Sequence, residues 1–109
     1  MHELGITESI VDAVLEAVED PVITSVHLEI GRLSGVVPDA IRFCFELVAD
    51  GTRLAGARLD VVEPAGRGEC RSCGAEVEMD DLLARCSCGS VDLAVVAGQE
   101  LRIKAVEVA

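Results

Sequence analysis

The chain has 109 residues, half of them hydrophobic and almost none aromatic, so any core must be aliphatic, built from Val, Leu, Ile and Ala. Its 20 acidic and 9 basic residues give a formal net charge of -11, which argues against nucleic-acid binding because that binding needs Lys and Arg to neutralise phosphates. No apolar run approaches the roughly 20 residues of a membrane span.

The first three residues, Met1-His2-Glu3, form a candidate chelate. The Met1 α-amine, the His2 backbone nitrogen and the His2 imidazole can close adjoining five- and six-membered rings around one ion. Ni(II) and Cu(II) favour such tetragonal nitrogen sets, and Glu3 can add an oxygen or its backbone nitrogen. A histidine at position two also occurs by chance as a solvated terminal side chain, so these residues alone leave both interpretations open.

Two helices and two strands are predicted before the cysteine-rich part of the chain. Apolar residues at three-and-four spacing predict a helix over 6–18, and alternation predicts a strand over 26–30. A proline in its first turn and Gly51 as its cap predict a second helix over 38–50. Alternation over 58–63 predicts the second strand.

Two side chains within these elements could bind a metal or take part in catalysis, but we interpret both as structural. Cys44 lies inside the second predicted helix, between two phenylalanines, where we expect a small buried core side chain. His27 alternates with apolar residues, which is typical of a solvated or hydrogen-bonded strand face. No nucleophile elbow or phosphate-binding glycine pattern occurs, and Asp80-Asp81 has the character of a solvated acidic turn. We therefore expect no catalytic site and no enzyme activity.

Four of the five cysteines form two pairs, Cys70-x-x-Cys73 and Cys86-x-Cys88, separated by twelve residues. A glycine follows each pair and can take the left-handed backbone that a metal-binding turn requires. Two such turns at the ends of a short hairpin would place four thiolates around one tetrahedral ion, the usual arrangement for structural zinc. The segment is too short to bury a sufficient core, so the ion must supply much of its folding free energy.

Other interpretations of these cysteines are a disulfide framework, an iron site of the rubredoxin kind, or buried thiols. Disulfides need an oxidising compartment, whereas the sequence starts without a basic and then apolar leader, so we expect a cytoplasmic protein. Iron would have similar spacing, but the only aromatic residues, Phe43 and Phe45, lie outside this segment. Unliganded thiols would not occur in glycine-followed pairs, so zinc is favoured.

A third strand is predicted over 100–104, and its alternation slips at Ala105 and Val106, as at a β-bulge or a strand end. The order of elements predicts an α+β fold, a small three-stranded sheet with two helices on one face. The cysteine segment would be a zinc-ribbon-like module with four Cys ligands, inserted between two strands of that sheet.

These boundaries divide the chain into two predicted domains. Residues 1–66 and 98–109 would form a nickel-binding α+β domain, and residues 67–97 an inserted zinc-binding domain. Two linkers, 63–68 and 91–98, would join them and let the inserted domain reorient as a unit.

Five segments carry a pattern that extends over essentially the whole chain. They are Met1-His2-Glu3, V-H-L-E-I-G-R-L-S-G-V at 26–36, R-F-C-F-E at 42–46, the four paired cysteines with C-G-S at 88–90, and E-L-R-I-K at 100–104. Together they resemble the HypA family of hydrogenase nickel-incorporation proteins. The two-cysteine turns are common by themselves, whereas their combination with Met-His-Glu is specific.

The resemblance implies a nickel metallochaperone that carries Ni(II) as cargo and Zn(II) as a structural ion. It also implies a companion GTPase, delivery of nickel to the large subunit of NiFe-hydrogenase, and in some members service to urease. The implied ligands are His2 with Glu3 nearby for nickel, and Cys70, Cys73, Cys86 and Cys88 for zinc.

This chain departs from the family pattern at two places. Its second pair is C-x-C, with Arg85 where the family has a cysteine and Cys86 displaced by one, so we expect a tighter and strained loop. Gly5 stands where a small hydroxyl residue is common, which is expected to loosen the start of the first helix. The alternative function is a zinc-ribbon interaction module in which the N-terminal histidine has no nickel role.

Overall fold

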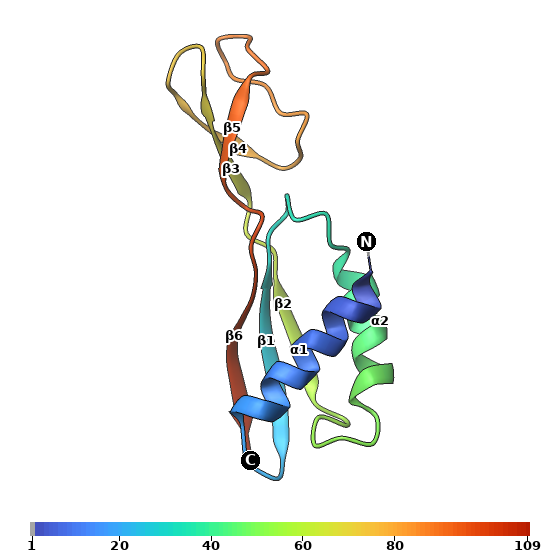
Figure 1. The fold of residues 1–109 in the computed structure, drawn as a ribbon. Coiled ribbons are helices and arrows are strands. Elements are labelled where there is room, and N and C mark those ends of the chain that lie inside the picture. Colours follow the sequence, from blue (N-terminus) through green and yellow to red (C-terminus); the bar gives the residue numbers. More distant parts are fainter. Residues whose placement is uncertain (1) are drawn as a thin grey trace.

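The computed structural model describes residues 2–109, which form two helices and two three-stranded sheets. Figure 1 shows the two sheets following one another along an elongated molecule of 54 × 22 × 17 Å. Within the described part, no helix has the length and apolar character needed to cross a membrane. The elements are α1 Glu3–Ala17, β1 Ile23–Ile30, α2 Pro38–Ala49, β2 Arg58–Val62, β3 Gly66–Cys70, β4 Glu76–Met79, β5 Leu93–Ala97 and β6 Leu101–Val108.

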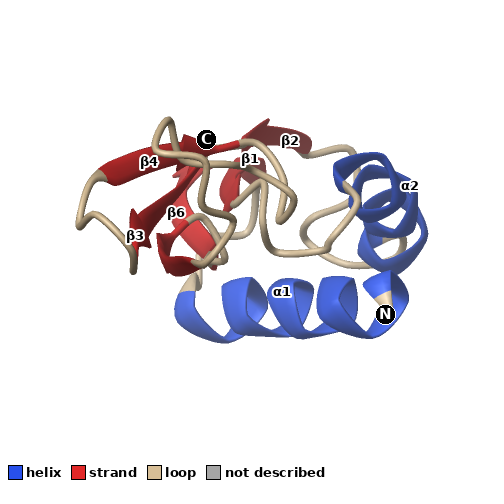
Figure 2. Ribbon diagram, turned by 90° about the horizontal axis from the view of Figure 1, so that it is seen from above, coloured by secondary structure: helices blue, strands red, loops and turns tan. Residues whose placement is uncertain are grey.

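The first sheet has the order β2-β1-β6, with β1 parallel to β2 and antiparallel to β6. Both helices lie on one side of it (Figure 2), and they bury a core against β1 that is aliphatic except for Phe45. The predicted α+β arrangement of two helices on a small three-stranded sheet is confirmed. Its core side chains are Ile10, Val11, Val14, Ile23, Val26, Leu28, Ile30, Ile41, Phe45, Ala49 and Leu54.

The start of α1 lies three residues before the predicted one. The His2 carbonyl accepts the first helical hydrogen bond, from the Ile6 N–H at 3.0 Å, and Glu3 places a carboxylate in the first turn. That carboxylate is favourable at the positive end of the helix dipole, a signal that apolar periodicity cannot detect. At the other end, the Arg53 guanidinium donates to the Leu15 carbonyl at 2.7 Å and so ties the loop after α2 to α1.

The slip predicted near the C-terminus is a β-bulge within β6. His27 of β1 pairs with Ala105, but the next residue, Leu28, pairs with Ile103, so Lys104 is the extra residue. The bulge interpretation is confirmed and the strand-end interpretation is wrong, because β6 continues to Val108.

The second sheet has the order β4-β3-β5 and contains half of the first predicted linker and most of the second. Segments 63–68 and 91–98 were predicted to be linkers, but residues 66–68 belong to β3 and residues 93–97 to β5, and these strands pair antiparallel with Arg67 opposite Ala97. Movement of the second sheet as a unit stays a prediction. β3 reads G-R-G-E-C, and its inward positions 66 and 68 are glycines. Because those glycines carry no side chain, the alternation that identifies a strand was hidden.

The two sheets meet at closely packed glycines. A Cβ on Gly31 would lie 2.0 Å from the Gly98 carbonyl oxygen, and one on Gly98 would lie 2.3 Å from the Gly66 Cα. The Leu33 N–H donates to the Gly98 carbonyl at 2.8 Å. Nearby, Arg32 pairs with Asp80 at 2.7 Å, so one carboxylate of the predicted solvated turn is tied to the first half of the chain.

We predict that Gly31→Ala destabilises the protein, because its new methyl group would meet backbone atoms rather than a flexible side chain. Overpacking of this kind costs about 1–3 kcal/mol. The matched control is Gly5→Ala, since a Cβ there meets nothing closer than the His2 Cβ at 3.9 Å, and alanine should stabilise α1 by up to ~1 kcal/mol. Urea unfolding measures the free energy of unfolding of both variants, which should fall for Gly31→Ala and rise for Gly5→Ala. A Gly31→Ala chain as stable as the parent would contradict the close packing at Gly31.

His27 lies on the sheet face opposite the helices and bridges both edge strands. Its Nε2 is 2.7 Å from a Glu107 carboxylate oxygen on β6, and its Nδ1 is 3.4 Å from Asp60 on β2. The Ser25 hydroxyl donates to the same Glu107 oxygen at 2.6 Å. The predicted hydrogen-bonded role of His27 is confirmed, whereas Cys44 is half-buried rather than buried as predicted.

The Glu107 network predicts a pH dependence of stability. The Ser25 hydroxyl, and then His27, hold the pKa of Glu107 below its ordinary value of 4.5. A carboxyl with a lowered folded-state pKa contributes stability that is present above the ordinary value and is lost as pH falls through the folded-state value. Glu107→Gln should therefore be less stable than the parent at pH 6. The difference in free energy of unfolding between the two should shrink as pH falls below 4.5. Urea titrations at each pH test this, with Glu46→Gln as the control, because Glu46 is an exposed residue of α2.

Candidate metal centres

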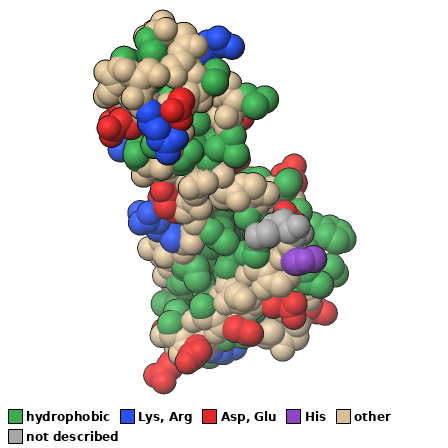
Figure 3. All heavy atoms as spheres, turned by 45° about the horizontal axis from the view of Figure 1, so that its top comes forward, with side chains coloured by type: hydrophobic (Ala, Val, Ile, Leu, Met, Phe, Trp, Pro, Cys, Tyr) green, Lys and Arg blue, Asp and Glu red, His purple; other side chains and the backbone are tan. Residues whose placement is uncertain are grey.

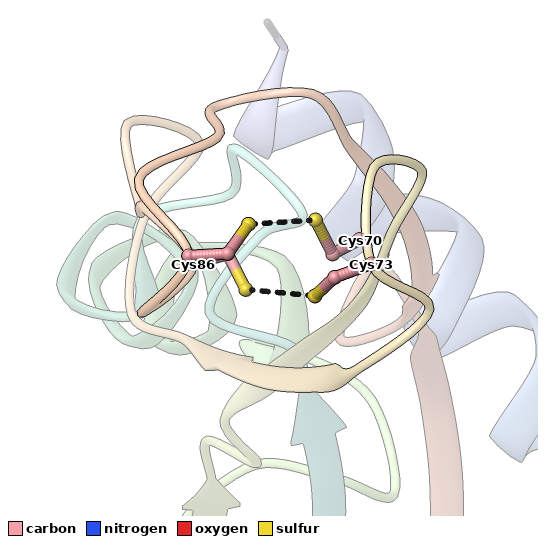
Figure 4. Close-up of side chains that lie close together, drawn as sticks. Cys70, Cys73 and Cys86 are labelled. Carbon is pink, nitrogen blue, oxygen red and sulfur yellow. Dashed lines mark hydrogen bonds between the residues drawn. The ribbon is translucent and has the colours of Figure 1, made fainter.

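The four paired cysteines converge at the end of the second sheet. Their sulfur atoms all lie within 4.8 Å of one another, with Cys70 3.7 Å from Cys88 and Cys73 3.6 Å from Cys86. A tetrahedron with Zn–S bonds near 2.3 Å has sulfur–sulfur edges of about 3.8 Å. Figure 4 shows Cys70 and Cys73 pointing from the first turn toward the sulfurs of the second. The shorter C-x-C loop therefore leaves Cys86 inside the cluster.

Each cysteine pair is shaped by the glycine that follows it. Gly74 has a φ of 76° and Gly89 a φ of 95°, both in the left-handed region. That conformation lets the Gly74 N–H donate to the Cys70 carbonyl at 2.8 Å, and the Gly89 N–H donate to the Cys86 carbonyl at 2.8 Å. The predicted glycine turns are confirmed, and they aim both members of each pair at the same point.

Burial in this part of the chain depends on the cysteines. Cys70 and Cys86 are buried, and Met79 is the only other buried hydrophobic side chain between residues 66 and 97. So little apolar burial cannot offset the entropy of ordering three strands. An ion bound by the sulfurs would supply the missing free energy.

The thiols of the cluster have different pKa values because they lie close to one another and to backbone N–H groups. Backbone N–H groups, foremost that of Cys73, lower the pKa of the Cys70 thiol to about 6. The Ala75 N–H acts in the same direction on Cys73, but the neighbouring Cys86 and Cys70 sulfurs outweigh it and raise the pKa of Cys73 to about 12. The cluster thus stabilises one thiolate and disfavours ionisation of a second thiol. A bound divalent cation would lower the pKa of the remaining thiols and favour their ionisation.

Two side-chain pairs that sequence reasoning missed hold the turns together. The Ser72 and Ser90 hydroxyls are 3.0 Å apart, and Arg71 forms an ion pair with Asp92 at 2.7 Å. Each joins the first turn to the residues after the second. The signal that could have found them is weak, because it consists only of polar residues flanking both pairs.

His2 lies exposed at the N-cap of α1, apart from the cysteine cluster, and its side chain makes no capping hydrogen bond. Its carbonyl is used by the helix, but the first N–H groups of a helix have no partner within it. The His2 imidazole borders an open groove lined with Gly5, Ile6 and Ser9. Imidazole and backbone nitrogen are therefore both available to a metal ion.

Glu3 follows His2 directly and lies in the first turn of α1. One of its carboxylate oxygens accepts a long hydrogen bond, 3.5 Å, from the Val37 N–H at the start of α2. The predicted contribution of the Met1 amine lies outside the described residues.

The fold and the cluster define a small α+β protein with a histidine at position two and four cysteines that could hold a metal ion. A model of the family described as hydrogenase/urease nickel incorporation, metallochaperone, HypA matches residues 1–108. The chain belongs to this family.

Curated relatives support the assignment. The hydrogenase maturation factor HypA of Nostoc punctiforme is 48% identical over 108 residues, covering 99% of this chain and 96% of the relative. That of Geobacter metallireducens is 48% identical over 109 residues and 99% of both chains.

Solved structures show the same fold. The nickel metallochaperone HypA of Helicobacter pylori, solved in solution, matches with a TM-score of 0.68 and 22% identity, over 99% of this chain and 97% of that one. A second solution structure of a HypA protein matches with a TM-score of 0.71 and 23% identity, over 100% of this chain and 97% of that one.

Proposed function

We propose that this chain is a cytoplasmic nickel metallochaperone, not an enzyme, that binds Ni(II) at His2 and delivers it during NiFe-hydrogenase maturation. The observation that carries the proposal is the exposed N-cap histidine with a free imidazole, in a chain of the HypA family. A cargo site must release its ion to a recipient, which suits an exposed site with few ligands better than a closed cage.

The position of the nickel site favours release. A cation at a helix N-terminus meets the positive end of the helix dipole, which weakens its binding. The Met1 amine, the His2 amide nitrogen and the imidazole compensate through a strong in-plane nitrogen set. With one Glu3 oxygen engaged by Val37, we infer that the Glu3 backbone nitrogen is the better candidate for a fourth ligand.

We infer that the cysteine cluster holds structural Zn(II) through Cys70, Cys73, Cys86 and Cys88. Sulfur separations close to those of a zinc tetrathiolate support this ion. In this proposal, residues 67–97 form a zinc-binding domain, and residues 1–66 together with 98–109 form a nickel-binding domain. Free thiols this close together also suit the reducing conditions of the cytoplasm.

The proposed partners are a companion maturation GTPase and the hydrogenase large subunit, with urease maturation proteins as a further destination. The family description, which names both hydrogenase and urease, supports these classes of partner.

Metal content of untagged protein, produced in cells given both ions, tests the proposal. We expect a single zinc and a single nickel per chain, and a colourless zinc form. Nickel that never binds beside filled cysteines would overturn the cargo role, and the visible absorption of a ferric tetrathiolate would overturn the zinc assignment.

A further inference from the structure

Exposed apolar side chains occur on α1, on α2 and at the start of α2. Phe43 and Leu47 lie four residues apart on α2, with 67% and 60% of their surface exposed; this spacing places them on one helical face. Leu4 on α1 and Val37 at the start of α2 are also exposed, and the Glu3–Val37 hydrogen bond brings their segments together. We call Leu4, Val37, Phe43 and Leu47 the helix patch.

The helix patch is exceptional for this chain. Phe43 is one of only two aromatic residues, yet it points away from the core, while Phe45 is buried within it. Figure 3 shows apolar side chains at the right edge of the molecule, with acidic side chains below them. Exposed apolar groups that cluster within a polar rim are typical of protein interaction sites.

The charge around the helix patch is negative. α1 carries four carboxylates and no Lys or Arg. Arg42 of α2 is engaged by Asp39 at 3.9 Å and by the Leu59 carbonyl at 3.2 Å, and Arg53 is engaged by the carbonyls at the end of α1. Carboxylates therefore dominate the rim and face solvent.

We propose that the helix patch docks a partner protein through a basic amphipathic segment, with apolar side chains over Phe43 and Leu47 and Lys or Arg along the carboxylate rim. A second copy of this chain would oppose one acidic rim to another, and an anionic lipid surface would also be repelled. The inference rests on the proposed function in one respect: Leu4 lies two residues after His2, so a docked partner would sit beside the nickel cargo.

The probe is a synthetic helical peptide of Leu and Lys, with its leucines on one face, titrated into the zinc-loaded, nickel-free chain. We expect its backbone shifts in isotope-edited NMR to concentrate in α1 and α2, and its affinity to fall as salt screens the rim. A Leu/Glu peptide of the same pattern should not bind. Shifts spread over the second sheet, or equal binding of both peptides, would overturn the proposal.

Substitutions locate the contact. The double variant Phe43→Ser with Leu47→Ser should bind the Lys peptide at least about tenfold more weakly, as expected when buried anchor residues are removed. Its match is Leu83→Ser with Val96→Ser, two exposed apolar residues of the cysteine-containing half, which should bind like the parent. Unchanged affinity in the first variant would overturn the proposal.

Two further readouts separate the alternatives. The patch variant should keep its nickel and zinc but fail to support hydrogenase maturation in cells; normal maturation would count against the patch. Absence of nickel binding in the parent would instead remove the proposed function and leave the peptide result standing. Sedimentation of the free chain as a dimer that the patch variant abolishes would assign the surface to a second copy.

Discussion

Replacing Cys73 by serine should remove the zinc and unfold β3, β4 and β5, while α1, α2 and the first sheet persist. The Cys73 side chain is exposed, so the serine removes one sulfur with little loss of packing. Zinc-finger peptides draw about 10–16 kcal/mol from their metal at neutral pH. The second sheet has only Met79 as a buried hydrophobic side chain besides its cysteines, so the proposed zinc ion would be its main source of stability.

Zinc content and hydrogen exchange together measure this result. We expect protection of amides in β3–β5 to fall by more than about 100-fold, because those strands would open independently of the rest. Cys44→Ser, at the half-buried cysteine of α2, is the control and should keep both zinc and protection. A Cys73→Ser chain that retained one tightly bound zinc and protected strands would refute the structural role of the cluster.

The same experiment reports on coupling between the two sheets. The Leu33 N–H donates at 2.8 Å to the carbonyl of Gly98, which lies between β5 of the second sheet and β6 of the first. Loss of the second sheet should therefore lower protection at Leu101 and leave it high toward Val106, where β1 holds the strand. Unchanged exchange over 101–104 would show that β6 is anchored by the first sheet alone.

The features that were predictable from sequence are those with a local cause. Helical spacing located α2 within a residue of its observed bounds, and alternation located β2. The cysteine spacing with its following glycines predicted a cluster that the fold assembles. Each signal depends on residues close together in the chain, where a spacing rule applies directly.

The features that escaped prediction depend on residues far apart or on missing side chains. β3 was hidden because its inward positions are glycines, and the same glycines allow the close approach of Gly98 and Gly31. The ion pair between Arg32 and Asp80 joins residues 48 positions apart. No local pattern encodes such a contact, since it exists only once both sheets are in place.

The second large effect concerns nickel. His2→Ala should abolish tight nickel binding and lower nickel affinity by more than about 100-fold. Losing a group that only supports a metal ligand costs about 10–100-fold, and losing a ligand itself should cost more. The imidazole is the one aromatic nitrogen of the proposed chelate, and without it the six-membered ring cannot close. Zinc content and thermal stability should not change, because the exposed His2 side chain makes no capping hydrogen bond.

Titration calorimetry with Ni(II) on untagged, zinc-loaded protein provides the measurement. His27→Gln is the matched control, because that histidine is engaged by Glu107 and Asp60 on the far side of the sheet and should leave nickel affinity unaltered. An additional residue before Met1 tests the chelate separately: it displaces the amine and should weaken nickel binding although His2 remains. Equal affinity in the His2→Ala chain would exclude the N-terminal site, and full affinity in the extended chain would exclude the amine alone.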